Sequence, residues 1–324
     1  MTPDTLVYLS RRDIEEIALP MTEIIAVLEK MFVEKGEGRV EMPPKPGIHP
    51  LEDSFIHAMP ASIPSMGAAG MKWIAGFPRN GSKGLPYING LLVLNDPETG
   101  IPIAVMDATW ITAQRTGAAT AVAAKWMARP ASQTAGIIAC GVQGRSNLEA
   151  LKVVCDIKQV KAYDINREVA EVYARDMERK LDVEVEVVSN PKDAVAGLDL
   201  VVTSGPILKH PEPVIQAGWL APGAFASPVD FDSYWCGEAL AEADRIATDD
   251  LGQMEYYRNQ GYFRQTPAAY ADLGEILTGK KPGRLSEDER LIAINLGIGL
   301  EDMATAVALF KRAQQFGIGT TLPL

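Results

Sequence analysis

The chain has 324 residues, of which 47% are hydrophobic and 23% charged, and its formal net charge is −11 at pH 7. This length suits two domains with ample material for hydrophobic cores, and the composition is that of a globular rather than a disordered protein. The acidic balance argues against a nucleic-acid partner, because no basic stretch is concentrated enough to follow a phosphate backbone.

Three isolated cysteines, Cys140, Cys155 and Cys236, have no metal-ligand spacing and are odd in number. They predict neither a disulfide framework nor a metal site, and they favour a reduced, cytoplasmic setting. Residues 1–16 lack the basic start and apolar core of a secretory signal. No uncharged apolar run is long enough to span a membrane, so we expect no membrane part.

The first third of the chain predicts a short strand, two helices and then a mostly antiparallel sheet. Ser10 suits an N-cap, and Pro20 suits the first turn of the second helix. A proline-rich loop that holds Lys45 and His49 follows this helix. The expected elements are a strand at 6–9, helices at 10–18 and 20–35, and strands at 55–63, 68–77, 88–95 and 101–106.

Two cations lie in segments that are otherwise apolar or made of small residues. Lys72 is inside the strand at 68–77, where a free ammonium is costly unless it has a partner or a ligand. The alternative is an edge-strand lysine that faces water. Arg115 lies on a helix expected at 109–127, whose alanines predict close packing and burial between domains. This arginine needs an anion nearby, and pairing with a structural acid is the alternative to a ligand.

The stretch 134–164 reads as strand, glycine turn, helix and second strand. Gly141 and Gly144 form the turn, and the second strand ends at Asp164, 23 residues past Gly141. A dinucleotide-binding unit places the carboxylate for the adenosine ribose about there, and glycine lets the pyrophosphate approach the helix N-terminus. Because Ala139 replaces the first glycine of G-x-G-x-x-G, a turn that binds nothing is the alternative.

The rest of the chain alternates strands and helices, which predicts a parallel sheet with right-handed crossovers. Ser204 and Gly205 end one expected strand, at the edge where cofactors bind in such sheets. Asp230 and Asp232 would share one face at the end of another strand, unless either caps a helix that begins near Ser233. The expected elements are helices at 167–180, 191–197, within 272–284 and at 300–316, and strands at 183–188, 198–203, 223–232, 244–248 and 291–296.

A set of short motifs runs in fixed order over nearly the full chain. They are Met59-Pro60, Lys72, Ala113-Gln114-Arg115-Thr116-Gly117-Ala118, Gly141-Val142-Gln143-Gly144, and the segments 272–275, 279–284 and 299–302. Together they resemble the ornithine cyclodeaminase/μ-crystallin family. The resemblance implies an α/β fold: a Rossmann-type dinucleotide-binding domain at 114–296, inserted in an α+β substrate-binding and dimerisation domain at 1–113 plus 297–324. It also implies a homodimer.

The same resemblance assigns roles to individual residues. Lys45, Lys72 and Arg115 would hold the substrate carboxylate beside the nicotinamide, and the catalytic aspartate would be Asp232 rather than Asp230. Lys72 would be the second catalytic residue, as a proton donor if burial lowers its pKa. The residues expected to bind the cofactor are Arg115, Thr116, Gly141, Val142, Gln143, Gly144, Asp164, Asn166, Arg167, Ser204, Gly205 and Asp232.

Three positions depart from the family pattern. Lys45 replaces an arginine, which exchanges a planar fork for a point charge. His57, also counted as a substrate-binding position, replaces a glutamate that helps with the distal amine of ornithine, and this argues against ornithine as substrate. The segment 228–232 lacks the glycine that relatives usually have before the aspartate, so the wall of the site should differ.

These observations predict an NAD(P)-dependent oxidoreductase that acts on the C–N bond of a small amino or imino acid, as an imine or ketimine reductase or an amino-acid dehydrogenase. Asp164 favours NAD, because a carboxylate repels a 2′-phosphate, while Arg167 keeps NADP as an alternative. Fixing both reactants makes hydride transfer unimolecular, and Asp232 would handle the proton. The rival functions are a redox-neutral, ornithine cyclodeaminase-type ammonia-lyase with bound NAD and a non-catalytic NAD(P)-dependent binding protein.

Overall fold

The computed structural model describes residues 4–324, and the chain divides into two compact units. Unit 1 comprises the chain up to Arg115 together with Gly297–Leu324, and unit 2 comprises Thr116–Leu296. Residues 1–3 lie outside the described part of the chain. They are the start of the segment 1–16, in which the sequence predicts no secretory signal. Within residues 4–324, every helix is too short or too polar to cross a membrane.

Unit 1 is built on a seven-stranded sheet with the order β15-β1-β6-β5-β4-β3-β2. Neighbouring strands are antiparallel except β1 and β6, which confirms the expected mostly antiparallel sheet. The strands of unit 1 are β1 (Thr5–Leu9), β2 (Gly47–Ile48), β3 (Phe55–Ile63), β4 (Ala68–Gly76), β5 (Ile88–Asn95), β6 (Pro102–Asp107) and β15 (Thr320–Pro323), and its helices are α1 (Arg11–Ile17), α2 (Met21–Gly36) and α9 (Gly299–Phe316).

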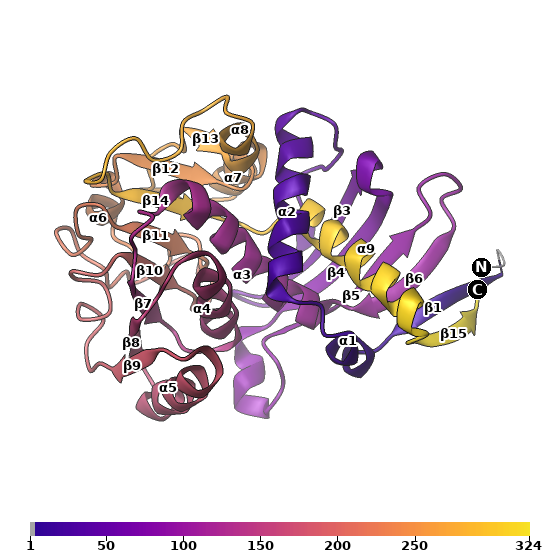
Figure 1. Cartoon of the computed structure of the whole chain (residues 1–324), viewed down its shortest axis with the longest axis horizontal. Coiled ribbons are helices and arrows are strands. Elements are labelled where there is room, and N and C mark those ends of the chain that lie inside the picture. The colour runs from indigo at the N-terminus through magenta and orange to yellow at the C-terminus, as the bar shows by residue number, and fades with distance from the viewer. Residues whose placement is uncertain (1–3) are drawn as a thin grey trace. The chain divides into compact units, whose positions relative to one another are not determined.

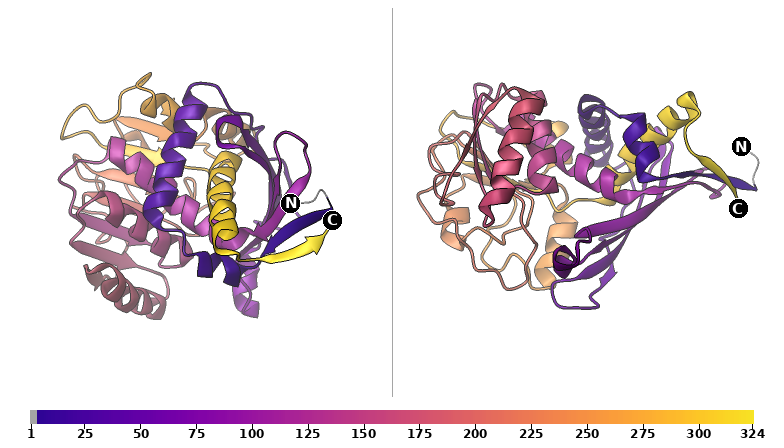
Figure 2. Two further views of the ribbon diagram at one scale, coloured as in Figure 1. Left: turned by 45° about the vertical axis from the view of Figure 1, so that its right-hand side comes forward. Right: turned by 90° about the horizontal axis from the view of Figure 1, so that it is seen from below.

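One face of this sheet is covered by helices. The sheet curves around α9, and α1 and α2 pack beside α9 (Figure 1, Figure 2). Strand alternation sends Met59, Ile74 and Leu92 to this face, where they are buried. The opposite face carries Trp73 and Leu91, which are cross-strand neighbours and are each 47% exposed. Unit 1 therefore has one covered and one open apolar sheet face.

The helix α3 (Ala108–Met127) contains the boundary between the two units. Its small residues pack closely, as expected: a Cβ on Gly117 would lie 2.3 Å from the carbonyl oxygen of Ser146. The hydroxyls of Thr120 and Ser227 are 3.0 Å apart and buried. The part of α3 in unit 2 is thus fixed against its sheet by contacts that larger side chains would prevent.

Unit 2 contains an eight-stranded sheet with the order β13-β12-β14-β11-β10-β7-β8-β9, in which all paired strands are parallel. This confirms the predicted βαβ alternation. The strand order reverses between β7 and β10, the place where such sheets bind ligands. The strands are β7 (Thr134–Ile138), β8 (Gln159–Tyr163), β9 (Glu184–Val187), β10 (Leu200–Thr203), β11 (Phe225–Pro228), β12 (Arg245–Thr248), β13 (Ala271–Asp272) and β14 (Leu291–Ile294), and the helices are α4 (Val142–Val154), α5 (Arg167–Leu181), α6 (Gly237–Ala241), α7 (Leu251–Asn259) and α8 (Leu273–Leu277).

Two predicted elements are wrong. The segment 191–197 forms successive turns instead of a helix, and it ends at Gly197 with φ +75°. The strand expected at 223–232 spans only Phe225–Pro228, so strand alternation does not extend to Asp230 and Asp232. The helices α6 and α7 and the short strands β2, β13 and β15 were not predicted. These elements are short or carry apolar residues on more than one side, and the periodicity of apolar residues is weak in such segments.

Candidate functional site

Lys72 is completely buried in an inner strand of unit 1. β4 lies between β3 and β5, so the alternative of an edge-strand lysine that faces water is wrong. Its Nζ donates to Oδ1 of Asp302 at 2.7 Å and to Oγ1 of Thr112 at 3.2 Å. These are its two hydrogen-bond acceptors among residues 4–324, whereas an ammonium has three donors. One N–H of Lys72 therefore remains for another acceptor.

Arg115 is held by two acids from the first turn of α9. Its Nε donates to Oδ1 of Asp302 at 3.0 Å, and its Nη1 donates to Oε2 of Glu301 at 2.8 Å. The guanidinium also lies against Gly297, where a Cβ would be 2.4 Å from Nη1 and where φ is +75°. The anion that the sequence required is thus a pair of structural acids, the alternative stated above, and Gly297 makes room for the guanidinium.

Lys45 joins the same cluster from the loop after α2. Its Nζ donates to the carbonyl oxygen of Gly297 at 3.1 Å, and the residue is buried. The segment from Gly297 to Asp302 therefore brings together Lys45, Lys72 and Arg115, which are distant in sequence. The cluster thus places three basic side chains beside the two acids Glu301 and Asp302.

Burial and neighbouring charges shift two pKa values in this cluster. Burial, together with the positive charges of Arg115 and Lys45, lowers the pKa of Lys72 to about 7, although the Asp302 carboxylate opposes the shift. Burial and the charge of Lys45 lower the pKa of His57 to about 3. His57 stacks on Phe55 with ring centroids 4.3 Å apart. His57 is thus a neutral imidazole at pH 7 and does not supply the negative charge of the glutamate whose place it takes.

In unit 2, the turn between β7 and α4 is the place where the sequence predicts a pyrophosphate site. A Cβ on Gly144 would lie 2.5 Å from the carbonyl oxygen of Ala139, so this glycine is needed for close packing of helix and strand. Among residues 4–324, a Cβ on Gly141 would meet no atom within 4 Å, and no side chain caps the N-terminus of α4. Ala139 itself has φ +71°, the left-handed region where glycine is usual. The turn therefore offers open space beside backbone N–H groups.

Asp164 follows β8 at the predicted place. Its Oδ2 accepts from the Cys140 N–H and its Oδ1 accepts from the Asn166 N–H, both at 2.9 Å. Asn166 caps α5 by accepting from the Glu168 N–H. Arg167 points along α5, with its Nε 3.0 Å from Oε1 of Glu171. The carboxylate of Asp164 is thus fixed against the glycine turn.

At the end of β10, Ser204 donates from Oγ to the carbonyl oxygen of Ala139 at 2.9 Å, which connects this edge to the glycine turn. Asp230 is fully buried and braces the same edge: its oxygens accept from Thr203 Oγ1 at 2.8 Å and from the Gly205 N–H at 2.9 Å. Burial raises the pKa of Asp230 to about 7.

Asp232 has different surroundings from Asp230. It is half-buried, its Oδ2 accepts from Thr266 Oγ1 at 2.8 Å, and burial raises its pKa. Phe231, between the two acids, has φ +63°, so the expectation that both share one face is wrong. The helix-cap alternative is also wrong, because the next helix, α6, has Cys236 as its N-cap.

The sequence of residues 5–316 matches the model of the ornithine cyclodeaminase/mu-crystallin family. The chain belongs to this family. It is 34% identical to an alanine dehydrogenase of Archaeoglobus fulgidus over 98% of both chains. The structure of Thermococcus litoralis Δ1-pyrroline-2-carboxylate reductase in complex with NADH and L-proline superposes with a TM-score of 0.89 at 32% identity, covering 97% of this chain and 99% of that one. An archaeal alanine dehydrogenase dimer with bound NAD gives a TM-score of 0.88 at 33% identity, covering 98% and 99%.

Membership of the ornithine cyclodeaminase/mu-crystallin family confirms the resemblance and the Rossmann-type α/β fold expected from the sequence. One buried polar residue, Asn295, is absent from the residues predicted from the sequence. Asn295 follows β14, is only 3% exposed, and both polar atoms of its amide lack a hydrogen-bond partner among residues 4–324. The signal was a polar residue directly after the apolar run 291–294, at the carboxyl edge of the sheet.

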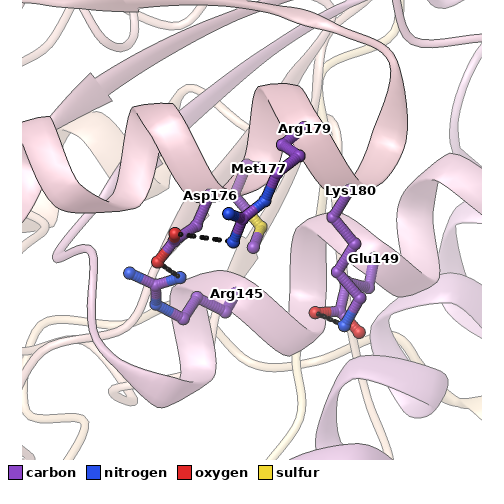
Figure 3. A pocket seen from close by; sticks show the side chains of 6 residues that line it. All are labelled: Arg145, Glu149, Asp176, Met177, Arg179 and Lys180. Carbon is purple, nitrogen blue, oxygen red and sulfur yellow. Dashed lines mark hydrogen bonds and ion pairs between the residues drawn. The ribbon is translucent and has the colours of Figure 1, made fainter.

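A surface hollow of about 460 Å³ lies between α4 and α5 (Figure 3). Its charged side chains are already paired with one another, as Arg145 is with Asp176 at 2.9 Å and Lys180 with Glu149 at 2.6 Å. None of the predicted site residues lines it. No group of three or more His, Cys, Asp or Glu residues suited to a metal ion occurs among residues 4–324.

Proposed function

We propose that this protein is an NAD(P)-dependent oxidoreductase that acts on the C–N bond of a small amino or imino acid, as an imine reductase or an amino-acid dehydrogenase, with NAD as the preferred cofactor. The observation that carries the proposal is the buried cluster formed by Lys45, Lys72 and Arg115 with Glu301 and Asp302. Lys72 in this cluster is completely buried and has one N–H more than its two acceptors among residues 4–324, which is costly unless a ligand supplies a third acceptor. A substrate carboxylate supplies this acceptor and lies beside the other two basic side chains.

The neutral state of His57 limits the class of substrate that the site would accept. A diamino acid such as ornithine carries a second ammonium, which needs an acceptor with negative charge. His57 stands where a glutamate would provide that charge, and with a pKa of about 3 it is uncharged at pH 7. The site therefore favours a monocarboxylate without a charged side chain.

The residues of unit 2 fit a dinucleotide. The N-terminus of α4 at Gly141 would receive the pyrophosphate, and Asp164 would accept hydrogen bonds from the adenosine ribose. The exposed side chain of Ile165, directly after Asp164, would contact the adenine, and the unpaired amide of Asn295 would bind a polar group of the cofactor. When bound, the cofactor supplies or accepts the hydride at the α-carbon of the substrate.

Protein side chains would handle the charge and the proton. Lys72 and Arg115 would orient the carboxylate, so that reaction at the α-carbon becomes unimolecular. Lys72, with a pKa of about 7 and one remaining N–H, is suited to donate the proton that an imine nitrogen gains during reduction. Asp232, which is half-buried, would exchange this proton with water.

The open sheet face of unit 1 supports a homodimer. Trp73 and Leu91 form an exposed apolar pair in the middle of that face, and apolar patches of this kind mark association sites. The archaeal alanine dehydrogenase of similar structure is a dimer. We place the protein in the cytoplasm, because free thiols such as Cys155 persist under reducing conditions.

The decisive experiment is a screen of cyclic imino acids, and of 2-oxo acids with ammonia or amines, against NADH and NADPH. We expect net oxidation of NADH with a monocarboxylic imine. Release of ammonia from a diamino acid without net change of cofactor would instead show a cyclodeaminase. Dinucleotide binding without turnover would indicate a binding protein.

The screen is paired with substitutions of Lys72. Lys72→Met should lower kcat/KM by about 10²–10⁴-fold, because it removes both the carboxylate contact and the proton donor. Lys311→Met is the matched control, since Lys311 is an exposed lysine of α9 in the same unit. Equal activity of the Lys72→Met variant and the wild type would contradict the proposal.

A further inference from the structure

We infer that Asp302 is a positioning residue that fixes Lys72 and Arg115 against each other through a single oxygen atom, and so prepares the geometry of the carboxylate site. This inference rests on the proposed function. Oδ1 of Asp302 accepts from Lys72 Nζ at 2.7 Å and from Arg115 Nε at 3.0 Å. The two cations are 230 and 187 residues away from it in sequence and come from β4 and α3.

A shared acceptor is required because the two cations repel each other. The positive charge of Arg115 opposes protonation of Lys72, and Asp302 favours it. Asp302 lies in the first turn of α9, where the helix N-terminus also stabilises a carboxylate. The acid thereby allows two cations to lie close enough to bind one carboxylate group.

Glu301, the neighbouring acid, holds Arg115 at a different nitrogen. Its Oε2 accepts from Arg115 Nη1 at 2.8 Å, while Oδ1 of Asp302 accepts from Arg115 Nε at 3.0 Å. The guanidinium of Arg115 is thus held at Nε by one acid and at Nη1 by the other, which fixes its plane. Because the same oxygen of Asp302 also accepts from Lys72 Nζ, Asp302 joins this plane to the ammonium of Lys72.

The second oxygen of Asp302 is further evidence that the residue does more than stabilise the fold. Oδ2 is buried and has no hydrogen-bond partner among residues 4–324. An unsatisfied buried carboxylate oxygen costs free energy, so a residue kept only for stability would be better satisfied. The cost is consistent with a requirement for full negative charge between the two cations.

Several elements bring charged or titratable groups to the surroundings of Lys72. Asp302 on α9 is the acid that pairs with it, Glu301 on α9 pairs with Arg115, and Arg115 on α3, Lys45 in the loop after α2 and His57 on β3 complete the set. Removing the charge of Asp302 takes away the carboxylate that contacts the ammonium directly. Lys72 should then lose its proton at lower pH and bind the carboxylate less well.

The test compares Asp302→Asn with Glu301→Gln, two substitutions that each remove one charge and keep the shape. Lys72 is followed by NMR of protein labelled with ¹³Cε-lysine, with its signal assigned by its loss in Lys72→Arg. In Asp302→Asn we expect Lys72 to titrate about one pH unit or more below the wild type. We expect KM for the carboxylate substrate to rise by about tenfold or more, while the Kd of NADH stays within about twofold.

In Glu301→Gln, KM should rise, but the titration of Lys72 should shift clearly less than in Asp302→Asn, because Asp302 makes the direct ion pair with Lys72. If Asp302→Asn leaves that titration unchanged, or if both variants shift it equally, the inference is wrong. If Asp302→Asn does not fold, Asp302→Glu is measured in its place. This variant keeps the negative charge, and we expect it to restore the wild-type titration of Lys72. The NMR titration needs no turnover, so an inactive wild type would count against the proposed function and not against this inference.

Discussion

At the scale of single residues, Lys72 shows how burial in an apolar strand changes the acid–base chemistry of a side chain. A solvated lysine is a permanent cation at pH 7, but complete burial lowers the pKa of Lys72 to about 7. Asp302 prevents a larger shift. The result is an amine that can hold either charge state under physiological conditions, as a proton donor and acceptor requires.

This pKa predicts how activity depends on pH. In the proposed mechanism, imine reduction needs protonated Lys72, so kcat/KM should be constant below about pH 7 and fall above it, by about tenfold per pH unit at the limit. Oxidation of the amino acid needs neutral Lys72 and should rise over the same range. The measurement is the pH profile of kcat/KM in both directions.

Asp230 also has a pKa of about 7, and it provides the control for this profile. Both oxygens of Asp230 accept hydrogen bonds at the end of β10. Asp230→Asn should therefore retain the limb of the pH profile, that is, the change of kcat/KM near pH 7, even if the stability of the protein falls. Lys72→Arg should lose that limb, because an arginine stays protonated. A limb that disappears in Asp230→Asn and persists in Lys72→Arg would assign the titration to Asp230.

At the scale of elements, the β7–α4 connection contains two glycines with different surroundings, Gly141 and Gly144. Gly144 lies where helix and strand are closest, and the Cβ of any other residue would clash with the backbone of Ala139. Gly141 has φ −76°, an ordinary value for any residue, and open space around it. The fold therefore needs Gly144 but places no such demand on position 141, where the proposed pyrophosphate contact would require glycine.

Gly141→Ala and Gly144→Ala should consequently differ in their effects. Gly141→Ala should leave the free energy of unfolding within about 0.5 kcal/mol of the wild type but raise the Kd of NADH by about tenfold or more. Gly144→Ala should lower the free energy of unfolding by about 1–3 kcal/mol, because the backbone must shift. Denaturant unfolding without cofactor and fluorescence titration with NADH measure both quantities. Wild-type NADH affinity in Gly141→Ala would exclude this turn as the pyrophosphate site.

At the scale of the whole molecule, the seven-stranded sheet of unit 1 leaves one apolar face open. The helices α1, α2 and α9 pack on one face only (Figure 2). Trp73 and Leu91 are cross-strand neighbours on the other face. A central pair of large apolar side chains at 47% exposure favours association of two copies.

Charges on this face should therefore prevent dimer formation. The double substitution Trp73→Glu and Leu91→Glu places like charges opposite each other on β4 and β5, and we expect a monomer where the wild type is a dimer. Sedimentation velocity measures the mass. Trp126→Glu is the control, because Trp126 is exposed to a similar extent, 42%, but belongs to α3 in unit 2. A wild type that is monomeric at micromolar concentration, or a control that dissociates equally, would contradict this assignment.

Much of the fold follows from local patterns. Alternation over 55–63 and 88–95 identifies strands within one residue of their ends, and the capping box of Ser10 and Asp13 begins α1 where expected. The wrong predictions at 191–197 and 223–232 occur where local composition is ambiguous. In the second case the chain leaves the strand because Phe231 adopts φ +63°, packed against Tyr257, Tyr262 and Phe263. Sequence alternation contains no signal for such a turn.

The sequence by itself determined the order of the elements, the parallel sheet, the glycine turn with Asp164, and the unusual places of Lys72 and Arg115, because each depends on residues near in the chain. Only the tertiary structure decided that β4 is an inner strand and that one oxygen of Asp302 joins both cations. Ion pairs between residues 187 and 230 positions apart depend on how α9 packs against β4 and on where the chain brings Arg115, and no local pattern specifies this. The charge state of Lys72 depends on the same contacts, because burial and neighbouring charges exist only in the folded chain.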